Sequence, residues 1–183
     1  MVPGSKGLII RACYCWEEQV FLVWEPVELS VSHILASRCT ITVCQITAIV
    51  RPVLEGIQYL RGQGRAFAVL SAGTLSLTEF GGVTPCGSGS GTSCKIDAAE
   101  MDAATMELFA VAEVVERLIM KNPSQYPWSA EVKSLPDELK RCNSPEMLLR
   151  SKPSEQLGDE GELKMLVNAA NKTAYHNLES SMI

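Results

Sequence analysis

A long amphipathic helix is the feature that most limits how this chain can fold. Apolar side chains recur at helical spacing from residue 43 to residue 60, at Val43, Ile46, Val50, Val53, Leu54, Ile57 and Leu60. Thr42 followed three residues later by Gln45 predicts a capping box at the start of this helix. Gly62 and Gly64 can adopt the left-handed conformation that ends helices. Pro52 lies inside the pattern and predicts a kink, because it removes one backbone donor.

The rest of the chain contains further predicted helices and short predicted strands. Helical patterns cover residues 103–120, 127–139 and 162–178, and a further helix starts at Ser144-Pro145-Glu146. Strand patterns cover residues 8–16, 20–24, 66–70 and 75–78. We therefore expect an α+β fold that is mostly α. At 183 residues the chain is long enough for one core, and we expect one domain plus a tail.

Composition argues against several classes of partner. The net charge is −5, so the chain lacks the basic balance that binding to nucleic acid or to an anionic membrane requires. The longest apolar stretch, at residues 41–50, is far shorter than a transmembrane span, and no secretory signal is visible. Seven cysteines form an odd number without framework spacing, which favours a reducing compartment. These observations predict a cytoplasmic or nuclear protein.

The spacing of the residues argues against two candidate ligand sites, a phosphate-binding loop and a zinc site. Residues 84–93 are rich in glycine and serine, which invites comparison with phosphate-binding loops. The lysine and the strand-to-helix glycine spacing that such loops need are missing, so we interpret this segment as a linker. Zinc requires compact pairs of ligands, whereas the two histidines, His33 and His176, lie far apart.

Three segments resemble eukaryotic protein kinases. They are residues 20–27, which read VFLVWEPV, residues 32–35, which read SHIL, and residues 50–64, which read VRPVLEGIQYLRGQG. The likeness covers roughly residues 8–153 and extends to the degenerate kinase-like proteins of filamentous fungi. It implies a protein-kinase-like large (C-terminal) lobe with a short β-hairpin remnant of the small lobe.

The resemblance also implies a division of the chain. Residues 1–153 would form a truncated protein-kinase-like domain, in which residues 1–27 are the small-lobe strands and hinge and residues 28–153 are the large lobe. Residues 154–183 would form a linker and an amphipathic C-terminal helix. The glycine-rich loop and the strand lysine of the family have no counterpart before residue 8.

The catalytic positions of the family are substituted. Kinases follow the long helix with His-Arg-Asp-Leu, three variable residues and Asn, and Phe67, Val69 and Thr74 stand at the His, Asp and Asn positions. Valine cannot accept the proton of an attacking hydroxyl, and Thr74 replaces a metal-binding amide. The Asp-Phe-Gly motif is missing, so Asp97 is left as a weak candidate metal ligand. Asp97 fits the acidic lead-in to a helix better.

Other positions follow from the resemblance. ATP and magnesium would be the cofactors, with Trp24, Glu25, Val27 and Ser76 at the hinge and the adenine pocket. We favour the simpler interpretation that Trp24 and Glu25 only join two lobes. Glu107 would replace the aspartate that braces the catalytic loop, and the helix that carries it would be buried.

We expect an inactive pseudokinase that acts by binding another protein. One alternative is residual ATP-dependent protein (Ser/Thr) kinase activity if a complete small lobe is supplied, and a second is a non-functional fragment. The hairpin from Leu8 to Trp24 has an open edge, which predicts pairing with another chain, including a second copy of this one.

Overall fold

The computed structural model describes residues 10–16, 19–24, 26–85, 93–95, 103–142, 144–151 and 160–180. In chain order the elements are β1 (Ile10–Trp16), β2 (Gln19–Trp24), β3 (Val27–Ser30), α1 (Val31–Ala36), α2 (Val43–Gly62), β4 (Arg65–Phe67), β5 (Leu75–Thr78), β6 (Val83–Pro85), β7 (Ser93–Lys95), α3 (Ala103–Lys121), α4 (Ala130–Arg141), α5 (Pro145–Ser151) and α6 (Glu160–Ser180). The fold is α+β and mostly helical, as the sequence predicts.

The long helix α2 lies at the centre of the molecule. Its start matches the prediction: Thr42 Oγ1 accepts from the Gln45 N–H, and Gln45 Oε1 accepts from the Thr42 N–H. Its end depends on Gly64, whose φ of 65° is left-handed, whereas Gly62 is still helical. The helix continues through Pro52.

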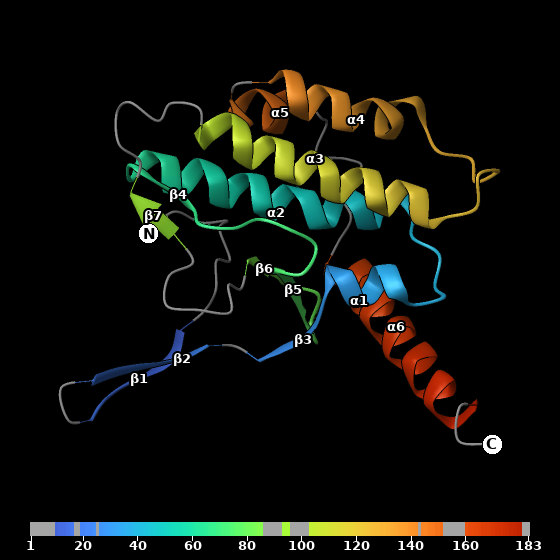
Figure 1. Ribbon diagram of the computed structural model, residues 1–183, viewed down its shortest axis with the longest axis horizontal. Coiled ribbons are helices and arrows are strands. Elements are labelled where there is room, and N and C mark those ends of the chain that lie inside the picture. The colour runs from blue at the N-terminus through green and yellow to red at the C-terminus, as the bar shows by residue number, and fades with distance from the viewer. Residues whose placement is uncertain are drawn as a thin grey trace.

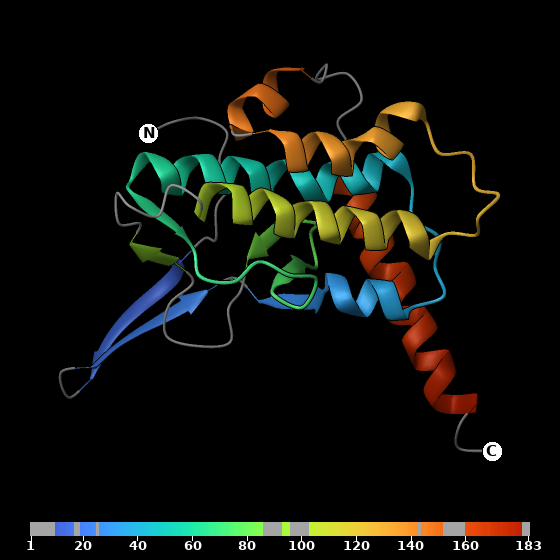
Figure 2. The same ribbon diagram turned by 45° about the horizontal axis from the view of Figure 1, so that its top comes forward.

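The apolar stripe of α2 is buried against several elements. α2 packs against α3, α5 and α6 as well as β4 and β6. Figure 2 shows α2 and α3 side by side, with α4 and α5 above them and the strands and α1 below. The stripe of α6 belongs to the same core, because Leu163, Leu166 and Val167 are buried with Ile46 and Ile49. The C-terminal helix is therefore part of the main body.

The strands form three small sheets, and all the pairs are antiparallel. β1 pairs with β2, β3–β5–β6 form a sheet of three strands, and β4 pairs with β7. The expected hairpin between β1 and β2 is present, and it projects away from the helical layers (Figure 1). A turn joins β5 to β6, with Gly81 at a φ of 88°.

Three expectations about these elements were wrong. The strand expected at residues 66–70 ends at Phe67, because the chain turns into a loop that contains Val69 and Leu70. Two strands, β3 and β7, were not expected at all. Residues 93–95 pair with β4 instead of extending the loop, and the interior of the expected linker, residues 86–92, lies outside the described residues.

The expectation that α3 is buried was only partly right. Its inner face belongs to the core, through Leu108, Val111, Ala112, Val114, Val115 and Leu118. Phe109 is 43% exposed and Met106 is 69% exposed, because both lie on the opposite face of the helix. No helix in the described ranges combines the length and the apolar character needed to cross a membrane.

Candidate functional site

The predicted catalytic-loop segment follows β4 and is tied to α3 by one buried carboxylate. The backbone N–H of Phe67 donates to Glu107 Oε1 over 2.8 Å. Glu107 is 5% exposed, so this hydrogen bond is protected from water. The short strand β4 ends at Phe67, and the bond to α3 fixes where the following loop begins. Glu107 therefore holds the start of this loop against α3 through one hydrogen bond.

The second oxygen of Glu107 lies in an ion pair. Glu107 Oε2 is 3.5 Å from Arg61 Nε, in the last turn of α2, although the geometry is not that of a hydrogen bond. Burial raises the pKa of Glu107 above its ordinary value of 4.5, and the Phe67 N–H and the Arg61 guanidinium partly offset that rise. The carboxylate thus links α3 to α2 and β4. Its burial disfavours the charged form.

Val69 and Thr74 take part in no arrangement that could activate a nucleophile. Val69 is 61% exposed and carries an aliphatic side chain. Thr74 Oγ1 accepts from the Ser71 N–H over 2.9 Å and lies 3.2 Å from the Ser71 carbonyl oxygen, to which its hydroxyl can donate. The Thr74 hydroxyl therefore closes a local turn, and its donor and acceptor capacity is used there.

The positions expected at the hinge and the adenine pocket are only partly brought together. Trp24 ends β2, with its backbone opposite Ile10, and Glu25 lies outside the described residues. Val27 starts β3 and pairs with Thr78, and Ser76 lies in β5, the central strand of the same sheet. Val27 and Ser76 thus share one sheet, while Val69 and Thr74 lie in the loop between β4 and β5.

A row of buried hydroxyl residues crosses this sheet, and the sequence did not reveal it. Ser30 of β3 and Thr84 of β6 are the backbone partners of Ser76, one on each side. All three are buried, and Thr84 Oγ1 has no hydrogen-bond partner among the residues that the structure describes. Ser30 Oγ lies 2.8 Å from His33 Nδ1. The row was missed because β3 was not expected, although Ser76 and Thr84 would have met in a predicted hairpin.

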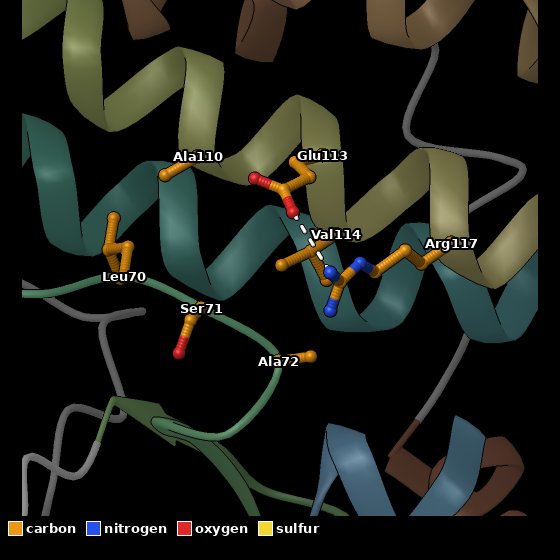
Figure 3. A pocket seen from close by; sticks show the side chains of 7 residues that line it. All are labelled: Leu70, Ser71, Ala72, Ala110, Glu113, Val114 and Arg117. Atoms are coloured by element: carbon orange, nitrogen blue, oxygen red, sulfur yellow. Dashed lines mark ion pairs between the residues drawn. The ribbon is translucent and has the colours of Figure 1, made fainter. Parts of the chain in front are cut away.

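A small hollow lies between the loop after β4 and the outer side of α3. It has a volume of about 40 Å³ and is lined by Leu70, Ser71, Ala72, Ala110, Glu113, Val114 and Arg117 (Figure 3). Across its rim Glu113 Oε1 lies 3.2 Å from the Arg117 guanidinium, and both side chains are largely exposed. The hollow is small compared with sites for drug-sized ligands, which take several hundred Å³.

The donor set at these positions does not fit a magnesium-bound nucleotide. Val69 offers no oxygen, and the Thr74 hydroxyl is engaged in its own turn. The weak candidate ligand Asp97 lies outside the described residues, and in the described part of the chain no group of three or more His, Cys, Asp or Glu side chains could hold a metal ion.

Comparisons with known proteins give the chain no family. No protein-family model matches it, and no curated protein gives a significant match.

Proposed function

We propose that this chain is a protein-kinase-like large lobe that does not transfer phosphate and that works by binding another protein. The order of its elements supports this proposal. The long capped helix α2, the loop that contains Val69 and Thr74, and the second long helix α3 follow one another in the order that the resemblance implies.

One observation carries the proposal: the scaffold contact around the former catalytic loop is kept while the chemical groups are not. Glu107 Oε1 accepts from the Phe67 N–H over 2.8 Å, at the position where the family uses an aspartate as a brace. Two residues after Phe67, an exposed Val69 replaces the proton acceptor. Loss of the base and of the metal-binding amide together removes most of the catalysis of phosphoryl transfer.

The proposed role in protein binding is supported by apolar residues at the surface. Val69 is exposed in the loop after β4, and Met106 and Phe109 are exposed on α3. The two-stranded β1–β2 sheet adds backbone edges to which a strand of another chain could pair. The proposal includes a reducing cytoplasmic or nuclear setting, with which the free thiols of Cys15, Cys39, Cys44 and Cys142 are compatible.

The proposal is tested with the full chain, ATP and Mg²⁺. We expect no radiolabelled phosphate to reach a general protein substrate or the chain itself, whereas an active protein kinase assayed in parallel labels both. Thermal unfolding gives a second readout. A nucleotide present at 100 times its Kd would stabilise the chain by about 2.7 kcal/mol. That would raise the Tm by roughly 5–10 °C. We expect no such shift, and magnesium-dependent turnover would overturn the proposal.

A further inference from the structure

The exposed face of α3 carries a regular seam of five residues. They are Met106, Ala110, Glu113, Arg117 and Met120, at successive spacings of four, three, four and three residues. This is the spacing of the contact positions in a helix pair that packs knobs into holes. The seam lies opposite the buried face of α3, whose centre is the fully buried Val115.

Four of the five side chains of this seam face solvent, and the fifth, Ala110, is half-buried beside the hollow. Met106 is 69% exposed and Met120 is 78% exposed. Glu113 and Arg117 are also more than half exposed. In Figure 2 α3 lies on the near side of the molecule, with α4 above it and α1 and the strands below it. Methionines at both ends of an exposed helical seam are typical of protein-binding surfaces, because the flexible side chain adapts to its partner.

We propose that this seam pairs with the same seam of a second copy of the chain, in an antiparallel homodimer. In such a pair the two-fold axis passes the helix at the level of Val115. Glu113 then faces Arg117 of the second copy, and Arg117 faces Glu113 of the second copy. Within one chain Glu113 and Arg117 already form an ion pair at 3.2 Å. The two pairs together form a ring of alternating charges, which is the self-complementary arrangement that a two-fold interface requires.

The same register brings a large side chain to a small one. Ala110 faces Met120 of the second copy, and Ala110 lines the hollow beside Leu70 and Val114. The hollow of about 40 Å³ offers room for the end of an unbranched side chain. The Glu113–Arg117 pairing and the Ala110–Met120 pairing both require the same register of the two helices. This agreement favours a second copy of the chain over an unrelated helix as the partner.

The expected interface is small. A contact along one face of a helix of 19 residues falls below the area of stable dimers, so we expect reversible dimerisation with a Kd on the order of 10–100 μM at low salt. The inference concerns the outer face of α3 and does not depend on whether the chain transfers phosphate.

Sedimentation equilibrium of the full chain, at concentrations up to about ten times that Kd, tests the inference. The wild-type chain is expected to show a monomer–dimer equilibrium that weakens as salt is added. Glu113→Arg and Arg117→Glu each create two like-charge contacts, and each should raise the Kd at least tenfold. Met120→Lys replaces the apolar side chain that faces Ala110 of the second copy with a charged one, and it should also raise the Kd at least tenfold. Glu55→Arg is the matched control, because Glu55 forms the same kind of i,i+4 pair with Arg51 on α2, and it should leave the Kd unchanged.

A mixing experiment separates pairing of the two seams from a general loss of fold. When the Glu113→Arg and Arg117→Glu chains are mixed, both contacts become attractive, so a heterodimer should form at close to the wild-type Kd. A wild-type chain that stays monomeric, or the absence of rescue on mixing, overturns the inference. Dimerisation that the three α3 variants leave unchanged would assign the contact to another surface, such as the β1–β2 hairpin, and overturns it as well.

Discussion

At the scale of single residues, Glu107 has the largest structural consequence in the candidate site. It is buried, it accepts the backbone N–H of Phe67, and it lies beside Arg61. A bracing role for Glu107 was expected only from the resemblance to protein kinases. Arg61 as a partner was not predicted, because it required knowing that the end of α2 and the start of α3 meet.

Replacing Glu107 with alanine should destabilise the fold. Glu107→Ala leaves the Phe67 N–H without its acceptor and removes the buried carboxylate beside Arg61, so we expect the free energy of unfolding to fall by about 2 kcal/mol. Urea unfolding followed by circular dichroism measures this change. Glu107→Gln keeps an acceptor for Phe67 and should cost less. An alanine variant as stable as the wild type would show that the brace contributes nothing.

The raised pKa of Glu107 gives a pH dependence with a definite sign. Because the folded-state pKa lies above 4.5, the native state holds this proton over a range of pH in which the unfolded state has lost it. The Glu107 contribution to stability is therefore largest below about pH 4.5 and is lost as the pH rises through the folded-state pKa. The difference in unfolding free energy between wild type and Glu107→Gln should decline across that window. A difference that grows with pH would contradict the raised pKa.

At the scale of elements, the sequence was most informative where the local signals were complete. α2 was predicted from its apolar period and its capping box, and the predicted first-turn Pro145 of α5 also matches the structure. β3 and β7 have three or four residues each, and they are strands only because β5 and β4 lie beside them. The prediction that α3 is buried did not say which of its faces meets the core, because an apolar helix does not reveal this, and Phe109 lies on the exposed face.

The hairpin provides a prediction at this scale. Within the described ranges β1 and β2 pair only with each other, and a sheet of two strands is marginal in water, so an added strand would stabilise it. Val20 and Leu22 occupy alternate positions of β2, opposite Cys15 and Cys13. Lysine at both positions should reduce aggregation at high concentration, because charges on edge strands oppose pairing.

Light scattering against concentration measures that aggregation. Glu55→Arg on α2 serves as the control, since it leaves both the hairpin and the outer face of α3 unchanged. Equal aggregation of the wild type and the double-lysine variant would exclude the hairpin as the site of association.

At the scale of the whole molecule, one core joins segments that lie far apart in the sequence. Asn122, at the end of α3, is buried and bonds both to the N–H and to the carbonyl of Ile41, just before α2. Gln45 Nε2 donates to the Glu162 carbonyl, which ties α6 to the start of α2. The amphipathic C-terminal helix therefore packs into the same core as the helices that precede it.

A core substitution in α6 tests this integration. Leu166 is 2% exposed, so Leu166→Ala should lower the free energy of unfolding by about 2–5 kcal/mol. Met165→Ala, one residue earlier and exposed, is the matched control and should change it by less than about 0.5 kcal/mol. Chemical unfolding should remain a single transition in both. An unaffected midpoint in Leu166→Ala would mean that α6 is independent of the core.

The sequence alone determined the mostly helical α+β class, the caps and extent of α2 and the β1–β2 hairpin, because caps and periodicity act over a few neighbouring residues. Only the tertiary structure decided that Glu107 meets Phe67 and Arg61, that Ser30, Ser76 and Thr84 form one row, and that α3 turns Met106 and Met120 to solvent. These features depend on contacts between residues 40 or more positions apart, or on which face of a helix other elements cover, and no local pattern specifies either.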